Sequence, residues 1–320
     1  MNNSNGTVLD KMKLNMSAEN FKEKFNQMVQ LEKQKSIHFI NHSELKFSTF
    51  FLLIEEIEYS EIFPRMNYRN RIAIKIIHSI QQRLYAHEIN YIASDKKIIQ
   101  VFLWMFKTGY LENEMQEDYD VVIDGVASLL IQKFHYKGIF HELAELIFKR
   151  NREGRYIHDL VWIIFHSKDI KILRILGKYL KSEHVKDRTL ASKLLRYDMT
   201  KIQTKDSSYE EWLSQNKQYI YFTGESLQLA SEPRFYRVNL EAKYLNKKVS
   251  HANGRTINSL SLYEKDNCEK IKNITCVDME LISRYSVILH DKNIYSWRKW
   301  MGYELKEQIE IAKKDLGGVI

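Results

Sequence analysis

Apolar residues recur at helical spacing along most of the chain, and this pattern is densest between residues 139 and 197. Apolar positions three or four residues apart predict four short amphipathic helices there, at about 139–150, 156–167, 169–181 and 184–197. The turns between them are very short. Because helices of this length cannot bury an apolar face alone, the pattern predicts helical hairpins that stack on one another.

Five further helices are predicted before this stretch. Ser17 is placed to cap the first, with Glu19 in its first turn and Phe21 and Phe25 on one face. The others are expected at about 44–59, from beyond Pro64 to about Leu84, from Ser94 or Asp95 to Gly109, and at about 122–134.

The pattern changes after residue 200. The segment YIYFTGES (219–226) has the aromatic and β-branched residues of a strand, and PRFYRVNLEAKYL (233–245) predicts an extended segment followed by a helical turn. Asn253-Gly254 is a typical hairpin-turn dipeptide. Further helices are expected after a cap at Ser207 or Ser208, at 278–290 and at 294–314.

These elements predict a mainly α fold class: stacked helical hairpins, as an irregular α-solenoid or bundle, with a C-terminal part of mixed helix and short strands. We expect a flexible N-terminal segment at 1–16, an all-helical stacked-hairpin domain at 17–200, and a C-terminal mixed domain or cap at 201–320. The scarcity of proline, two residues in 320, favours the helical reading, since proline interrupts helices.

One segment resembles a HEAT or armadillo-type helical repeat. Asp169 stands in a turn, the pair Leu173-Arg174 follows, and the small residue Gly177 comes three positions later. The resemblance covers residues 156–181 and implies that a neighbouring helix approaches closely at Gly177. Some HEAT-like proteins are DNA-base glycosylases, but the resemblance carries no catalytic residue across to this chain.

Charge and composition narrow the function classes. The formal net charge is +8 and the isoelectric point about 9.1, but the basic residues are spread along the chain rather than gathered in a tail. The first twenty residues lack the apolar core of a signal peptide, and the apolar run Phe50–Ile54 is too short for a membrane span. We expect a cytoplasmic protein that makes no membrane contact, with Cys268 and Cys276 reduced.

Three acidic or histidine-containing patterns are candidates for chemistry. HELAE (141–145) approaches the HExxH zinc motif, but Glu145 stands where the second histidine belongs. His135, His141, His158 and His166 lie close in sequence, and the segment LENEMQEDYD (111–120), with Asp124 beyond it, is rich in carboxylates. Solvated helix faces and loops explain all three, so no catalytic residue, metal or cofactor is expected.

Basic and aromatic groups are the candidate binding residues. Clustered arginines beside aromatic rings are typical of phosphate-binding surfaces and of protein interfaces. The predicted binding residues form three groups along the chain: Arg65, Tyr68, Arg69 and Arg71; Lys149, Arg150, Arg152 and Arg155; and Trp297, Arg298 and Trp300.

The leading functional hypothesis is a non-enzymatic helical scaffold or adaptor that binds another protein, within a larger assembly. The alternative is a nucleic-acid-binding helical-repeat protein that uses the two arginine groups. A hydrolase acting through HELAE or the acidic segment is the least favoured class.

Overall fold

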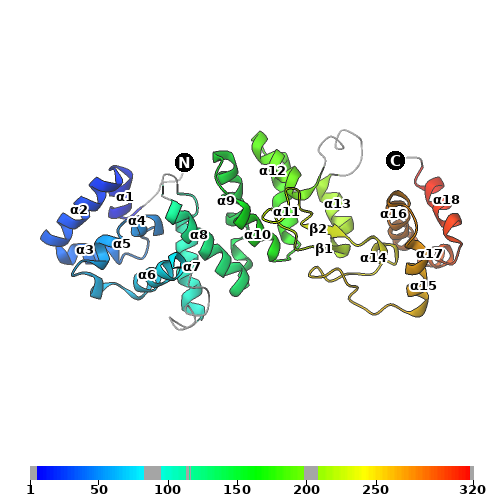
Figure 1. Cartoon of the computed structure of the whole chain (residues 1–320), viewed down its shortest axis with the longest axis horizontal. Helices are drawn as coiled ribbons and strands as arrows, with labels where there is room; N and C mark the ends of the chain where they lie inside the picture. The colour runs from blue at the N-terminus through cyan, green and yellow to red at the C-terminus, as the bar shows by residue number, and fades with distance from the viewer. Residues whose placement is uncertain (1–5, 83–94, 113–114, 116, 198–207, 318–320) are drawn as a thin grey trace. The chain divides into compact units, whose positions relative to one another are not determined.

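A computed structural model describes residues 6–82, 95–112, 115, 117–197 and 208–317. Within these ranges the chain is mainly helical, with 18 α-helices and a two-stranded antiparallel sheet (Figure 1). The predicted fold class, helical hairpins with a mixed C-terminal part, is confirmed. Contacts divide the chain into two compact units, Met1–Arg150 and Asn151–Ile320, and each is described by itself.

The first unit is built from helices with short connections. Their order is α1 (Val8–Leu14), α2 (Ala18–Leu31), α3 (Lys33–Ile40), α4 (Phe47–Leu52), α5 (Ile54–Glu58), η1 (Phe63–Arg65), α6 (Tyr68–Gln81), α7 (Asp95–Gly109), α8 (Glu117–Ser128), η3 (Leu129–Lys133), η4 (Lys137–Ile139) and α9 (Phe140–Glu153), which runs three residues past the unit boundary.

Local signals position several of these helices as the sequence predicts. The side chain of Ser17 accepts a hydrogen bond from the backbone N–H of Asn20 at the start of α2, and Phe21 and Phe25 are fully buried. α7 ends at Gly109, as expected. The predicted positions Leu84 and Ser94 lie outside the described residues.

Residues 8–14, within the segment that the sequence predicts to be flexible, form α1. Thr7 and Asp10 make a reciprocal capping box that satisfies free backbone N–H groups at its start. Leu9 is fully buried against the unit, and this burial holds a helix of only two turns in place.

Two predicted helices of the first unit are interrupted. The expected helix at 44–59 is divided at Leu53 into α4 and α5, and the expected helix at 122–134 continues past Ser128 as the π-helical turn η3. A hydrophobic period indicates which face is buried, but it does not indicate where the backbone hydrogen bonds change register.

An aromatic cluster forms part of the core of the first unit. Phe47 on α4 lies edge-on to Trp104 of α7, at 5.5 Å between ring centroids, and stacks on Tyr119 of α8 at 5.7 Å. The hydroxyl of Tyr119 donates to the carbonyl of Gly109 at 3.0 Å. Helices α4, α7 and α8 are therefore joined through three aromatic rings.

The second unit begins with helices and continues into a mixed region. Its order is α10 (His158–His166), α11 (Lys171–Lys178), η5 (Tyr179–Lys181), α12 (Val185–Leu195), α13 (Tyr209–Asn216), η7 (Lys217–Tyr219), β1 (Ile220–Phe222), β2 (Tyr236–Val238), α14 (Leu240–Tyr244), α15 (Leu262–Ile271), α16 (Cys276–Lys292), α17 (Ile294–Met301) and α18 (Leu305–Asp315).

Gly177 on α11 is a point of close helix approach, as the sequence predicts. A β-carbon built at Gly177 would lie 2.5 Å from Cε1 of Tyr209 on α13, well inside van der Waals contact. Ser208 caps α13 through a capping box with Glu211, and Tyr209 is the first residue of that helix. The alternative cap, Ser207, lies outside the described residues.

The predicted strand and hairpin are both present. β1 pairs with β2 in antiparallel register, with Tyr221 opposite Arg237. The Asn253-Gly254 turn joins two arms that meet at the antiparallel bridge between Val249 and Thr256. The backbone N–H of Phe222 donates to the carbonyl of His251 at 2.9 Å, so the hairpin lies along β1.

The C-terminal helices surround α16. Figure 1 shows α16, α17 and α18 beside one another, with α14 next to α16. Trp300, Met301 and Ala312 are buried among them. The expected helix at 294–314 is broken into α17 and α18 near Gly302, which allows the chain to fold back and bury Ala312.

The predicted domain limits stay predictions. The compact division lies at residues 150 and 151, whereas the expected boundary at 200–206 falls in 198–207, outside the described residues.

Candidate functional site

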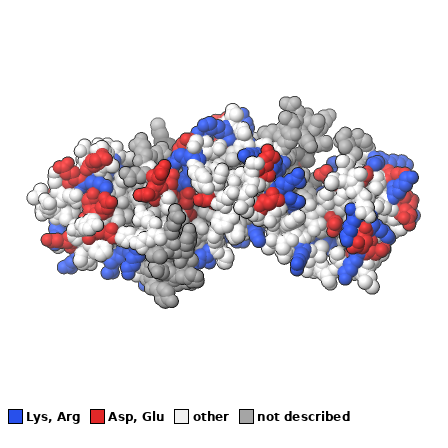
Figure 2. Space-filling model, viewed as in Figure 1, with Lys and Arg blue, Asp and Glu red and all other residues white. Residues whose placement is uncertain are grey.

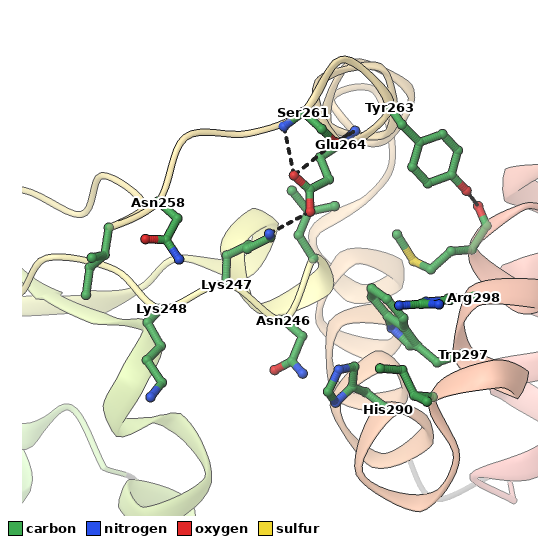
Figure 3. Close-up of a pocket in the computed structure, with 14 residues that line it drawn as sticks. Asn246, Lys247, Lys248, Asn258, Ser261, Tyr263, Glu264, His290, Trp297 and Arg298 are labelled. Atoms are coloured by element: carbon green, nitrogen blue, oxygen red, sulfur yellow. Dashed lines mark hydrogen bonds and ion pairs between the residues drawn. The ribbon is translucent and has the colours of Figure 1, made fainter.

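An open groove of about 830 Å³ lies in the C-terminal part of the second unit (Figure 3). It is formed by the end of α14, the hairpin that follows, the start of α15, the end of α16, and α17. Its apolar lining is Leu245, Ile257, Tyr263, Ile294, Trp297 and Met301. Its polar lining is Asn246, Lys247, Lys248, Asn258, Ser261, Glu264, His290 and Arg298.

Trp297 is held in a fixed orientation in this groove. Its indole N–H donates to the hydroxyl of Ser286 at 2.7 Å, and that hydroxyl donates to the carbonyl of Tyr244 at 2.5 Å. His290 meets the indole edge-on, with ring centroids 5.0 Å apart. The ring is half-buried, so it offers a rigid apolar surface at little cost in side-chain entropy.

Lys247 and Glu264 form an ion pair at 2.7 Å on the opposite wall, and it is drawn as a dashed line in Figure 3. Glu264 also accepts from the backbone N–H of Ser261 at 2.8 Å and so caps α15. Although burial opposes it, the hydrogen bonds from Lys247 and Ser261 lower the pKa of Glu264. The carboxylate is therefore ionised at neutral pH and neutralises Lys247.

Two aliphatic side chains of the groove are unusually exposed. Ile257 is 66% exposed and Ile294 is 40% exposed. Exposed single apolar residues are common, but two that share a groove with a half-buried tryptophan are typical of a binding surface.

Only part of the third predicted binding group lies at this surface. Trp297 and Arg298 line the groove, and Arg298 is exposed. Trp300 is 2% exposed, and its indole N–H donates to the carbonyl of Gln308 at 3.3 Å, so it packs in the core beneath.

Arg69 of the first predicted group stabilises its own unit. Its guanidinium donates to the carbonyls of Ser43 and His42 at 2.7 and 3.0 Å, and it lies 4.0 Å from the ring centroid of Trp104. Burial lowers the pKa of Arg69 to about 10, which still leaves it charged at neutral pH. These contacts use both terminal nitrogens of the guanidinium.

The other members of that group are more accessible. Arg65 and Arg71 are exposed, and Tyr68 is 41% exposed with the ammonium of Lys97 5.2 Å from its ring centroid. Arg69 therefore stabilises the fold of its unit, whereas the other three side chains of the group are exposed.

The second predicted group is largely engaged within the protein. Arg150 is 2% exposed and contacts Asp120 at 3.2 Å and Asp124 at 2.8 Å. Arg152 donates to both carboxylate oxygens of Asp187, at 3.0 and 2.9 Å.

Lys149 and Arg155, the other two members, also have partners. Lys149 donates to the carbonyl of Leu111, and Arg155 pairs with Glu153 at 2.9 Å. The structure thus does not gather these four residues into one open basic patch.

The patterns considered for catalysis are dispersed. Within HELAE, Glu145 accepts from the hydroxyl of Tyr110 at 2.9 Å, and Glu142 lies 3.7 Å from Lys107. In the acidic segment, Glu112 pairs with Lys13 at 2.6 Å. In the part of the chain that is described, no three His, Cys, Asp or Glu side chains come together as a metal site.

A stripe of four cations along α11 and η5 was missed by the sequence analysis. Lys171, Arg174, Lys178 and Lys181 recur at i, i+3, i+7 and i+10, and all four are exposed. Helical spacing alone places them on one face, so the motif KxxRxxxKxxK could have indicated it. The groove residues Lys248, Ile257 and His290 were also missed, and no local motif marks them.

Three comparisons with known proteins found no match to this chain. No family model matches the chain, and neither a curated protein nor a solved structure matches it. None of the helices in the described ranges is long and apolar enough to cross a bilayer.

Proposed function

We propose that this chain is a non-enzymatic helical scaffold that binds another protein, and that the groove on α17 is its binding site. The observation that carries the proposal is the groove itself: a fixed Trp297 lies beside the exposed Arg298, opposite the ion pair of Lys247 and Glu264. Tryptophan and arginine are the residues that most often dominate protein-binding surfaces.

The character of the groove favours a protein partner over a small substrate. It mixes apolar side chains with charges of both signs, as protein interfaces do. Its rings and aliphatic groups are positioned to exclude water from a bound side chain. The proposal places the protein in the cytoplasm, within a larger assembly, in keeping with the free thiols of Cys268 and Cys276.

Affinity purification of the full chain from its native cells, with quantitative mass spectrometry, tests this function. We expect a partner at stoichiometric yield that Ile257→Asp loses, because a carboxylate at this exposed position disrupts an apolar contact without disturbing the core. The matched control is Leu229→Asp, since Leu229 is 85% exposed and lies outside the groove. Recovery of the chain alone, or a partner retained by Ile257→Asp, would contradict the proposal.

A second candidate function, nucleic-acid binding, is favoured by one observation. The four exposed cations of the α11 stripe form no ion pair with any described residue, and they extend over about 15 Å at a helical rise of about 1.5 Å per residue. Neighbouring cations one helical turn apart can contact successive phosphates.

Electrophoretic shift with a 20-nucleotide single strand tests this alternative. We expect the double variant Arg174→Glu/Lys178→Glu to abolish the shift if the stripe binds phosphates. The control is Lys270→Glu/Lys272→Glu, which changes the net charge equally at two lysines that already pair with acids. Equal loss of binding in both double variants would indicate an effect of net charge rather than a site.

A further inference from the structure

The groove carries positive charge that its own acidic residue does not neutralise. Glu264 already forms an ion pair with Lys247 at 2.7 Å, and it accepts a hydrogen bond from the backbone N–H of Ser261 at the N-terminus of α15. The side chains of Lys248 and Arg298 are both exposed and form neither an ion pair nor a hydrogen bond with any residue in the described ranges. A ligand that fits the groove therefore meets two available cations.

These two cations lie on opposite walls of the groove. Figure 3 shows Lys248 on the wall formed by the hairpin, and Arg298 beside Trp297 on the wall formed by α17. The exposed side chains of Ile257 and Ile294 line the same space. Each wall of the groove thus presents one of these cations and one exposed aliphatic side chain.

The groove also offers a group for pairing with a peptide backbone. The exposed side-chain amide of Asn258 has no hydrogen-bond partner among the described residues. An amide presents both a donor and an acceptor, so it can satisfy a backbone N–H or C=O of an extended chain. A volume of about 830 Å³ falls within the range of about 300–1,000 Å³ that is usual for ligand sites.

We propose that the groove binds an acidic segment of a partner protein, in which an apolar side chain packs on Trp297 and flanking carboxylates meet Arg298 and Lys248. This inference rests on the protein-binding function proposed above and specifies the chemistry of the partner. An acidic segment with an apolar side chain fits better than a nucleic acid, because Ile257 and Ile294 expose aliphatic groups in the groove that offer no favourable contact to a phosphate backbone.

Fluorescence anisotropy with three dye-labelled, N-acetylated hexapeptides tests the ligand chemistry. The probes are Glu-Glu-Trp-Leu-Glu-Glu, its charge-reversed form Lys-Lys-Trp-Leu-Lys-Lys, and Glu-Glu-Ser-Gly-Glu-Glu, which lacks the apolar pair. We expect the first to bind the full-length protein at least tenfold more tightly than either of the others. Comparable affinity of the first peptide and either of the others would overturn the proposal.

Arg298 and Lys299 are neighbours on α17, so the same substitution at each gives a matched pair of variants. Arg298→Glu is expected to weaken binding of the first peptide at least tenfold, and Lys248→Glu similarly. Lys299→Glu is expected to change it less than twofold, since Lys299 is exposed on α17 but does not line the groove. Unchanged circular dichroism and melting temperature establish that each variant is folded, and equal effects of Arg298→Glu and Lys299→Glu would overturn the assignment.

A single-stranded oligonucleotide separates the competing class of ligand. If it binds as tightly as the acidic peptide and is weakened by Arg298→Glu, the groove is a phosphate site and the proposal is wrong. If none of the peptides binds while Ile257→Asp still loses the native partner, the proposal of an acidic ligand is wrong and the protein-binding function stands. If Ile257→Asp also retains the partner, both fail.

Discussion

Arginines close together in the sequence have different roles once the chain is folded. Arg69 donates to two backbone carbonyls and lies over Trp104, whereas Arg71, two residues later on the same helix, is exposed and its side chain forms no hydrogen bond or ion pair with a described residue. Because a helix turns by about 100° per residue, positions two apart point to nearly opposite faces. Clustering of charge in a sequence therefore does not establish a common surface.

We predict that Arg69→Ala lowers the free energy of unfolding of the first unit by about 2–4 kcal/mol, because it leaves two carbonyls without their charged donor. Arg71→Ala is the control and is expected to change it by less than about 0.5 kcal/mol. Urea denaturation followed by circular dichroism measures both. Equal effects of the two substitutions would show that the contacts of Arg69 do not stabilise the unit.

Lys243 gives a second prediction at this scale. It is 8% exposed and its ammonium donates to the side-chain oxygen of Asn216 at 2.7 Å. Burial lowers the pKa of Lys243 from 10.5 to about 8. Between these two pH values the unfolded chain binds more protons than the folded one, so this group makes the protein more stable as pH rises from about 8 to 10.5.

The comparison of wild type with Lys243→Met isolates this effect, because methionine does not titrate. We expect the stability of wild type relative to the variant to increase with pH through this window, by at most about 3 kcal/mol. Chemical denaturation at several pH values provides the measurement. A difference that is constant from pH 7 to 10.5 would contradict the lowered pKa.

At the scale of elements, short helices depend on specific contacts with their neighbours. α11 has eight residues, too few to be stable alone, and it is held by its buried apolar face and by the approach of α13 at Gly177. Glycine is a poor helix former, but its lack of a side chain allows the ring of Tyr209 to pack closely against α11.

Gly177→Ala should therefore destabilise the second unit by about 1–2 kcal/mol, although alanine is the better helix former, because its methyl group collides with the ring of Tyr209. In a Tyr209→Ala background the same substitution should stabilise by up to about 1 kcal/mol. Thermal unfolding of the double-mutant cycle measures the coupling. Additive effects would show that the ring and the glycine do not meet.

At the scale of the whole molecule, the net charge of +8 does not identify a partner. Figure 2 shows positive and negative side chains interspersed over the face in view. Among the described residues, the α11 stripe and the groove both present exposed cations without an ion-pair partner, and they predict different responses to salt.

If a single strand bound all four cations of the stripe, its association constant would fall about 50-fold between 50 and 200 mM salt, because each phosphate contact releases a counterion. The acidic peptide in the groove engages two cations and an apolar surface, so its affinity should fall much less. Titrations of both ligands over this range distinguish the two functions. A steep salt dependence for the peptide would indicate that it engages more cations than the two assigned to it.

The sequence by itself determined the helical class, several element boundaries and the hairpin turn. The Ser17 cap, a cap at Ser207 or Ser208, the end of α7 at Gly109 and the Asn253-Gly254 turn were all predictable, because each depends on backbone hydrogen bonds between residues a few positions apart. Such interactions leave a readable local pattern.

Tertiary structure alone decided which charged and aromatic residues are available for binding. The groove brings the 245–264 segment against residues 290–301, and Trp297 and Trp300, three residues apart, are divided between the groove and the core. Arg150 and Arg152 are paired by acids 26 to 35 residues away. No local pattern encodes these pairings, because they depend on how the helices pack rather than on the spacing of residues along any one of them.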